Sequence, residues 1–483
     1  MRARCKKNRL TVAFVALGCP KNIVDSEKML ADIGQAGFII SDDTDNADVV
    51  VINTCGFIKP AKDEAFEAIA AAVEQKKRGK VRKVVVAGCL VQRMGAELAK
   101  EMDGIDAIAG LGARDDIADI ITRSLAQSAR QKPAIYLEPS DRRIGDDTGR
   151  LLITPGHTPY LRISEGCDRA CSFCTIPAIK GRFRSKPAEL VLAEAQELVR
   201  NGAVEISIIA QDSTYYGTDL GIKNGLSRLV KELDKIEALR WIRLMYLYPA
   251  GIDDELIETI AGSKKVVNYI DMPIQHINDD ILKAMRRGDR KEKIAELIEK
   301  LRRVMPDVVL RTTLIAGFPG ESDEQFEELS DFVRTVKFDA LGCFGFCAEE
   351  GTPAAKMTGQ VPQAVKNERL ERLMLTQQQI AFEKARGRIG QELVCLIDEV
   401  DESGLGRGRF YGQAPKIDSV CYIKSVPPGP SAVAKASIFA KATTDKMAGQ
   451  KAHPTIRSLK PGEFVGVKVG GSQDYDLLCR AIL

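Results

Sequence analysis

Apolar positions in the first 125 residues form short continuous runs that alternate with helical patterns. Three runs are typical of strands buried on both faces: Leu10–Gly18 (LTVAFVALG), Asp48–Thr54 (DVVVINT) and Lys83–Gly88 (KVVVAG). A shorter strand is predicted near 38–41. Val-rich strands separated by helices predict a parallel, Rossmann-like sheet covered on both faces. The helices expected between the strands cover about 22–35, 60–77 and 91–102.

The strand and helix alternation restarts at Tyr160, after a stretch at 126–152 that has no clear period and is predicted to be a linker. Amphipathic helices, such as 187–201 and 323–336, separate six apolar runs. Six such units predict an open, partial (β/α) barrel, which a long helix over about 362–386 would close. The predicted strands are 160–165, 205–211, 241–248, 269–275, 308–316 and 339–346.

A different texture begins after Arg388, where short alternating runs are separated by turn residues. Examples are Glu392–Ile397, Ser419–Ile423 and Glu463–Val469, and they predict a small antiparallel β-barrel. An insertion rich in Pro, Ala, Lys and Ser interrupts it near 426–456. The fold class is therefore α/β in three parts. The expected boundaries are 9–125 for the N-terminal domain, 126–152 for the linker, 153–386 for the barrel and 387–483 for the C-terminal barrel.

Composition narrows the class of protein. The chain has 483 residues, of which 45% are hydrophobic and 28% charged, as in soluble globular proteins. The net charge of +3 argues neither for nor against a nucleic-acid partner. No apolar run is long enough for a bilayer, and the basic N-terminus lacks the apolar core of a signal peptide. We expect a cytoplasmic protein, where twelve cysteines point to metal ligands rather than disulfides.

The strongest chemical signal is the segment Glu165–Pro177 (EGCDRACSFCTIP). Its cysteines Cys167, Cys171 and Cys174, here called the barrel triad, follow the first barrel strand with C-x3-C-x2-C spacing. Three thiolates can hold three irons of a 4Fe–4S cluster and leave the fourth iron open. A closed zinc site would need a fourth ligand, which no nearby Cys or His provides. The spacing therefore favours a cluster with an open iron, placed where barrel enzymes carry their chemistry.

A second set of cysteines occupies equivalent positions in the predicted N-terminal sheet. Cys19, Cys55 and Cys89, here called the sheet triad, each follow directly after a predicted strand. Because parallel strands end at one edge of a sheet, the three thiols are expected to meet there if the strands are neighbours. The alternative is that three buried cysteines happen to end strands.

The barrel triad resembles the signature of the radical S-adenosylmethionine (SAM) superfamily. The resemblance implies that SAM binds the open iron and is cleaved to a 5′-deoxyadenosyl radical. Wider motifs resemble the methylthiotransferase family within it, whose second cluster, implied here for the sheet triad, takes part in sulfur delivery. The residues that carry this match are Ala16–Asn22, Val24–Glu27, Asn53–Ile58 and Gly88–Leu90. Asp25, Ser26 and Glu27 also suit the first turn of a helix, which is the simpler explanation of their polarity.

Two branches of the family differ in substrate. Pro20–Asn22 and Gly56–Ile58 resemble the branch that modifies an aspartate side chain of ribosomal protein uS12. Ala414–Asp418 and Tyr475–Leu477 resemble a TRAM domain, a substrate-docking module. The resemblance implies conversion of that aspartate to β-methylthio-aspartate, with two 4Fe–4S clusters and SAM as cofactors. The implied partners are uS12, free or within the small ribosomal subunit, and an electron donor; a monomer is expected.

Further positions carry weaker signals. Gly317, Gly320 and Glu321 follow a barrel strand and are similar to the family segment near SAM, although a Gly/Pro turn alone is common. His276 follows another barrel strand, where it could line the site or pack in the core. The remaining cysteines are predicted to be non-ligands: Cys5, Cys343, Cys347, Cys395, Cys421 and Cys479.

Two alternative functions are compatible with parts of the sequence. A tRNA adenosine 2-methylthiotransferase would share the same cofactors and modify a nucleoside. A zinc-stabilised RNA-binding protein without catalysis belongs to a different class, and two sets of three cysteines fit it poorly, because closed zinc sites want four ligands.

Overall fold

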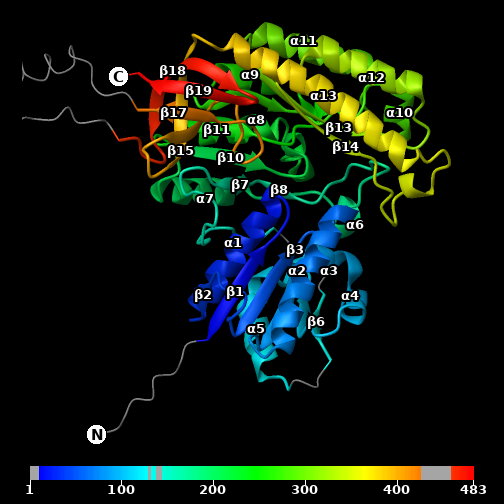
Figure 1. Ribbon diagram of the computed structural model, residues 1–483, viewed down its shortest axis with the longest axis vertical. Helices are drawn as coiled ribbons and strands as arrows, with labels where there is room; N and C mark the ends of the chain where they lie inside the picture. Colours follow the sequence, from blue (N-terminus) through cyan, green and yellow to red (C-terminus); the bar gives the residue numbers. More distant parts are fainter. Residues whose placement is uncertain (1–9, 129–131, 138–143, 426–457, 483) are drawn as a thin grey trace, which may run out of the picture.

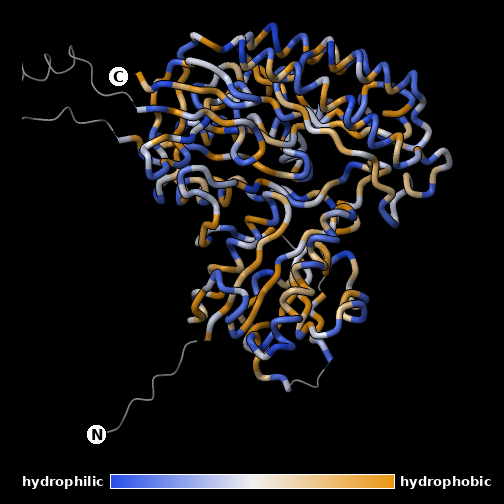
Figure 2. The backbone as a smooth tube through the Cα atoms, viewed as in Figure 1, coloured by the Kyte–Doolittle hydropathy of each residue, from blue (hydrophilic) through white to orange (hydrophobic). Residues whose placement is uncertain are grey.

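The computed structural model describes residues 10–128, 132–137, 144–425 and 458–482. Figure 1 shows the N-terminal sheet (blue to cyan) below two parts that pack on each other, the central strands and helices (green to yellow) and a C-terminal barrel (orange to red). Figure 2 shows hydrophobic segments along the N-terminal strands and a more hydrophilic outer layer of helices. Within the described residues, no helix has the length and apolar character needed to cross a bilayer.

The N-terminal part is a six-stranded parallel sheet in the order β2-β1-β3-β4-β5-β6. Successive residues of a strand point to opposite faces. Val50 and Ile52 accordingly pack with α2, α3 and α4, whereas Val49 and Val51 pack with α1 and α5. The strands are β1 (Thr11–Ala16), β2 (Ile39–Ser41), β3 (Val49–Thr54), β4 (Lys83–Gly88), β5 (Ala107–Ala109) and β6 (Ala134–Tyr136). The helices are α1 (Pro20–Gln35), α2 (Lys59–Lys77), α3 (Cys89–Met94), α4 (Ala96–Glu101), the 3-10 helix η1 (Leu111–Asp116) and α5 (Ile117–Ala126).

Two expectations for this part are wrong. The helix predicted over 91–102 is two short helices, because Gly95 adopts a left-handed φ of 59° between them. The predicted linker contains β6, which pairs with β5, a strand that the apolar pattern also missed. Both strands have only three residues, too few to display a period.

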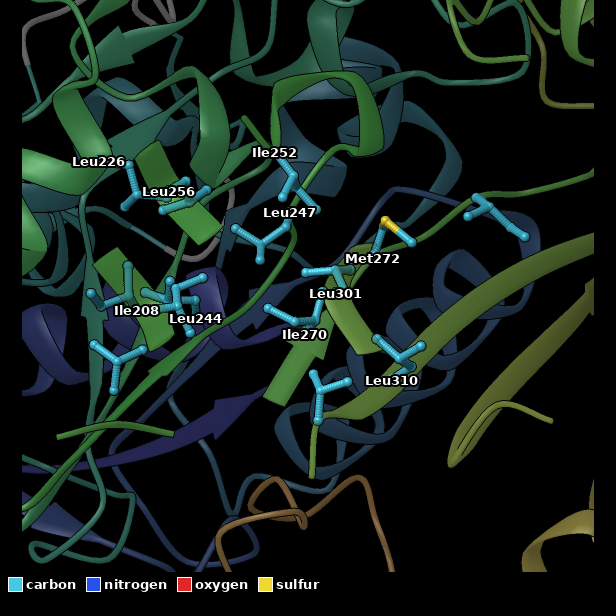
Figure 3. Close-up of a cluster of buried hydrophobic side chains, with 14 of the residues drawn as sticks. Ile208, Leu226, Leu244, Leu247, Ile252, Leu256, Ile270, Met272, Leu301 and Leu310 are labelled. Atoms are coloured by element: carbon cyan, nitrogen blue, oxygen red, sulfur yellow. The ribbon is translucent and has the colours of Figure 1, made fainter. Parts of the chain in front are cut away.

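The central part is an open sheet of six parallel strands in the order β14-β13-β12-β11-β10-β7. Figure 3 shows Ile208, Leu244, Ile270 and Leu310 projecting from four neighbouring strands into a core shared with the surrounding helices. The strands are β7 (Tyr160–Arg162), β10 (Glu205–Ile209), β11 (Trp241–Leu244), β12 (Val266–Asp271), β13 (Val309–Ala316) and β14 (Ala340–Gly345), with β8 (Ser164–Glu165) and β9 (Arg184–Ser185) forming a separate pair. The helices are α6 (Ile176–Lys180), α7 (Ala188–Arg200), α8 (Gly225–Leu233), α9 (Asp254–Gly262), α10 (Asp279–Ala284), α11 (Lys291–Val304), α12 (Asp323–Val336) and α13 (Gln363–Gly387).

The C-terminal part is a closed five-stranded barrel in the order β15-β16-β17-β19-β18. All of its pairings are antiparallel except that of β17 with β19, which is parallel. Arg409 of this barrel is buried against Glu205 at the start of β10, at 2.8 Å. The predicted insertion at 426–456 lies outside the described residues. The strands are β15 (Glu392–Val400), β16 (Gly406–Phe410), β17 (Cys421–Lys424), β18 (Phe464–Gln473) and β19 (Asp476–Ala481).

Candidate active site

The sheet triad lies at one edge of the N-terminal sheet. Its cysteines follow β1, β3 and β4, which are neighbours in the sheet. The thiols also act on one another. Burial is the main cause that raises the pKa of Cys55, and Cys19 adds to it. Burial likewise raises the pKa of Cys89 to about 12, with Lys180 opposing the shift and Cys19 and Cys55 adding to it. The fold therefore brings together three thiols that are far apart in the sequence.

Close backbone approach explains the residues before these cysteines. A Cβ on Gly18 would lie 2.8 Å from Cβ of Cys55, and one on Gly88 would lie 2.3 Å from Oδ1 of Asn53. Asn22 donates from Nδ2 to the carbonyl of Leu17 at 2.5 Å. Asn53 donates to the hydroxyl of Ser26 at 2.8 Å and thereby links two cysteine turns. These motif residues hold the turns in place.

The barrel triad is held by a loop between β8 and α6. Backbone N–H groups donate to two of its sulfurs, from Arg169 to Cys167 and from Ile176 to Cys174, each at 3.4 Å. Ser172 in the same loop donates from its backbone N to the carbonyl of Met285 at 3.0 Å. Burial is the main cause that raises the thiol pKa of Cys167 to about 11 and that of Cys174 to about 12. Because their pKa values are raised, these thiols are protonated at neutral pH, and metal binding, which needs thiolates, would release protons. The N–H groups aimed at sulfur would then stabilise the bound thiolates.

Cationic and aromatic groups surround the barrel triad. Arg169 lies over the ring of Tyr248, 4.0 Å from its centroid, and donates from Nε to Asp212 at 2.8 Å. Burial raises the pKa of the Cys171 thiol, while the guanidinium groups of Arg287 and Arg169 act in the opposite direction. Each guanidinium already pairs with a buried carboxylate, Arg169 with Asp212 at 2.8 Å and Arg287 with Asp289 at 2.9 Å.

The loops that carry the two triads meet at the junction of the N-terminal sheet and the central barrel. Thr175, which follows Cys174, donates from Oγ1 to the carbonyl of Phe57, two residues after Cys55, at 3.1 Å. Arg93 of α3 donates to the carbonyl of Gly56 at 2.8 Å and forms an ion pair with the buried Glu349, also at 2.8 Å. The loops that carry Cys55 and Cys174 are therefore in direct contact.

A buried ionic network joins the two parts beside the triads. Asp147, which is 0% exposed, contacts Arg114 and Arg162 at 2.7 Å and Lys186 at 2.6 Å. Asp25 of α1 pairs with Arg162 at 2.7 Å. Burial opposes ionisation, but the three cations around Asp147 hold the pKa of its carboxyl well below its usual range. Asp25 and its neighbours therefore connect α1 to the barrel, which the helix-turn explanation of their polarity did not anticipate.

Two lysines lie between this network and the sheet triad. Lys180 of α6 is 3.4 Å from both Asp25 and Glu165. Burial disfavours its charge, but Cys89, Glu165 and Asp25 outweigh that effect and raise the pKa of Lys180. Lys21 of α1 lies over the ring of Tyr246, 3.5 Å from its centroid. Burial again opposes the charge, while Tyr246, Cys19 and Glu165 raise the pKa of Lys21. Lys21 lies within the motif Pro20–Asn22, and Lys180 follows Cys174 by six residues without belonging to a motif.

The turn that contains Gly317, Gly320 and Glu321 lies beside the barrel-triad loop. Phe318, within the turn of Gly317 and Gly320, packs in a cluster that includes Phe173 of the barrel-triad loop. Glu321 accepts from the backbone N of Gly317 at 2.5 Å and pairs with Arg369 of α13 at 3.2 Å, so its carboxylate joins the turn to α13.

His276 is 0% exposed, and its Nδ1 accepts from the backbone N of Asn278 at 3.0 Å. Burial, the largest cause, lowers the pKa of His276 to about 3; Glu328 of α12 is a charged neighbour. This placement favours a role in packing.

Other cysteines also gather. The core of the C-terminal barrel contains Cys395, Cys421 and Cys479. Hydrogen bonding with Cys395 is the largest cause that raises the pKa of Cys421 well above its usual value, while hydrogen bonding with Cys479 opposes it. Strands β15, β17 and β19 bring these three thiols together, which their spacing in the sequence does not indicate. Among the described residues, no three His, Cys, Asp or Glu side chains converge closely enough to bind a single metal ion. A four-iron cluster is larger, and each thiolate of a triad would bind a different iron.

Comparison with known protein families covers each part of the chain. The model of the Radical SAM superfamily matches residues 161–333. The Uncharacterized protein family UPF0004 matches residues 11–110, and the TRAM domain matches 389–482. The sheet triad lies within the second match and the barrel triad within the first.

Full-length relatives decide the family. The chain is 45% identical over 473 residues to the ribosomal protein uS12 methylthiotransferase RimO of Geobacter sulfurreducens, with 98% of each chain covered. It is 42% identical over 472 residues to the protein of the same name from Symbiobacterium thermophilum, covering 97% of this chain and 90% of that protein. The chain belongs to the RimO family of methylthiotransferases. It is therefore a radical SAM transferase, and the zinc-stabilised, non-catalytic alternative is wrong.

Solved structures agree at the level of the fold. The radical SAM methyltransferase TsrM of Kitasatospora setae has a TM-score of 0.51 to this chain at 14% identity, covering 70% of this chain and 73% of that one. Membership of the RimO family confirms the predicted cofactors, SAM and 4Fe–4S clusters.

Proposed function

We propose that this RimO-family protein converts one aspartate side chain of ribosomal protein uS12 to β-methylthio-aspartate. Its relatives carry ribosomal protein uS12 in their name and match nearly the whole chain. The observation that carries the proposal is the contact between the two cysteine loops, the Thr175 hydroxyl on the carbonyl of Phe57 at 3.1 Å. A radical formed at one triad and sulfur held at the other can act on one substrate carbon only if the two sites are adjacent.

We propose that the barrel triad, Cys167, Cys171 and Cys174, holds the SAM-binding cluster and that the sheet triad, Cys19, Cys55 and Cys89, holds the second. The donor sets fit: each has three thiols, and Arg169 and Ile176 add N–H groups aimed at sulfur. When bound, SAM and the clusters would supply a radical able to take hydrogen from Cβ, and the sulfur and methyl group that replace it.

The chain's own residues hold and shield this chemistry. Arg93 and Glu349 fasten the Cys55 loop against the barrel. The ionic network around Asp147 fixes the angle between the two parts, and Gly317 and Gly320 border the cluster loop through Phe318. Buried walls of this kind keep water from a radical intermediate. The protein is proposed to act in the cytoplasm, where uS12 is available free or within the small ribosomal subunit.

The test is a mass measurement on uS12. The protein, purified without oxygen and loaded with iron and sulfide, is incubated with SAM, reductant and recombinant uS12. A methylthio increment localised to one aspartate supports the proposal. Unmodified uS12 alongside released 5′-deoxyadenosine would overturn the substrate and turn attention to tRNA, while no 5′-deoxyadenosine would contradict the assignment of the barrel triad.

A further inference from the structure

Lys21 is a buried cation without a carboxylate partner. Only 7% of its surface is exposed. In the described part of the chain its ammonium forms no ion pair; it lies over the ring of Tyr246, 3.5 Å from its centroid, and also interacts with the Tyr246 hydroxyl and with Cys19. A buried charge is costly unless an opposite charge approaches it. Tyr246, Cys19 and Glu165 act on the ammonium electrostatically, but no carboxylate forms an ion pair with it in the described residues, so it can bind one more anion.

The nearest acidic group is already occupied. Glu165, which acts on Lys21 electrostatically, accepts from Nε2 of Gln211 at 2.6 Å with one oxygen and from Arg162 at 2.8 Å with the other. Lys180 also lies 3.4 Å from Glu165. Glu165 is thus engaged by three other side chains and acts on the Lys21 ammonium without forming an ion pair with it.

Tyr246 is held against Lys21 by a strained backbone. Its φ is 60°, a left-handed value that a bulky residue rarely adopts. Its N–H donates to Asp271 at 2.9 Å, and its carbonyl accepts from Ser213 at 3.0 Å. Arg311 in turn pairs with Asp271 at 2.7 Å. Strain maintained by such partners is commonly found at ligand sites, and here it fixes the aromatic support of the ammonium.

Lys21 lies between the segments that carry the two triads. It follows Cys19 of the sheet triad by two residues, and its neighbours Tyr246 and Glu165 belong to the barrel, where Glu165 precedes Cys167 by two. We propose that the Lys21 ammonium binds the carboxylate of the substrate aspartate and selects an acidic side chain, an inference that rests on the proposed function. Lys21 thereby determines specificity.

Equilibrium binding of two forms of uS12 tests this assignment. The holoenzyme is titrated calorimetrically with uS12 and with uS12 whose target aspartate is replaced by asparagine. A hydrogen bond to a charged group predicts that wild type binds the aspartate form about 10- to 100-fold more tightly. Lys21→Gln should reduce this ratio to about one. Lys28→Gln removes a lysine from the same helix, where its ammonium contacts the carbonyl of Thr148, and should leave the ratio unchanged.

The remaining outcomes are also decisive. Lys21→Arg keeps the charge and should keep a preference for aspartate; if Lys21→Gln fails to fold or loses iron, a folded Lys21→Arg without that preference overturns the proposal. An unchanged affinity ratio in Lys21→Gln also overturns the proposal. If that variant keeps the ratio but no longer incorporates sulfide, the ammonium acts on sulfur instead of on the substrate. A wild type that methylthiolates uS12 but binds both forms equally refutes the role of Lys21 alone, whereas uS12 left unmodified refutes the proposed function.

Discussion

Replacing Asp147 by asparagine should weaken the junction between the N-terminal sheet and the barrel. Asp147 is fully buried and is the common partner of Arg114, Arg162 and Lys186 at 2.6 to 2.7 Å. Asp147→Asn keeps the shape but leaves three buried cations with one counter-charge fewer. Removing one partner of a buried ion pair costs about 3 to 5 kcal/mol. For a folding unit of about 150 to 250 residues, this loss of stability corresponds to a fall in the unfolding temperature of about 6 to 20 °C.

The assay is anaerobic thermal unfolding of the holoenzyme, followed by circular dichroism. Asp146→Asn is the matched control, because the Asp146 carboxylate is exposed and accepts hydrogen bonds from the backbone N and the hydroxyl of Thr148. The pKa of Asp147 is depressed in the folded state, so its contribution is present at neutral pH and is lost as pH falls through the folded pKa. Wild type should therefore lose more stability on acidification than Asp147→Asn. Equal unfolding temperatures for the two variants would refute the reasoning.

Three further predictions concern the cofactors and pH. Alanine at any position of the barrel triad should abolish 5′-deoxyadenosine release, whereas alanine in the sheet triad should spare release and stop sulfur insertion; loss of release in both sets would contradict separate roles. Lys180→Gln removes a cation that acts on Cys89, so the midpoint potential of the second cluster should become more negative by tens of mV. The conversion is on the order of 60 mV for each 1.4 kcal/mol of electrostatic stabilisation that the reduced cluster loses. EPR measures this potential, and a positive shift would contradict the electrostatic argument. His276 stays neutral in the folded protein with a pKa of about 3, so stability is full above the unfolded pKa near 6.5 and falls by about 2 kcal/mol from pH 7 to pH 5. His276→Asn should flatten that slope in urea titrations, and an unchanged slope would show that another group titrates.

The sequence by itself was sufficient for the local features of this protein. Continuous Val-rich runs predict buried parallel strands, and the position of one cysteine after each of β1, β3 and β4 predicts the sheet triad. The C-x3-C-x2-C spacing likewise announces the barrel triad, because all of its members lie in one loop. These features depend on residues close in sequence or on the general rule that parallel strands end at one edge.

Only the tertiary structure decided which distant groups share a buried space. Asp147 meets Arg114, Lys21 meets Tyr246, and Glu349 meets Arg93, all across long stretches of chain. Such pairs leave no periodic signal, since a buried charge resembles a surface charge until its partner is placed. The three-residue strands β5 and β6 were missed for a related reason: their pairing comes from the neighbouring strand rather than from a pattern of their own. Local chemistry was therefore readable from the sequence, whereas the junction that brings the two triads together required the fold.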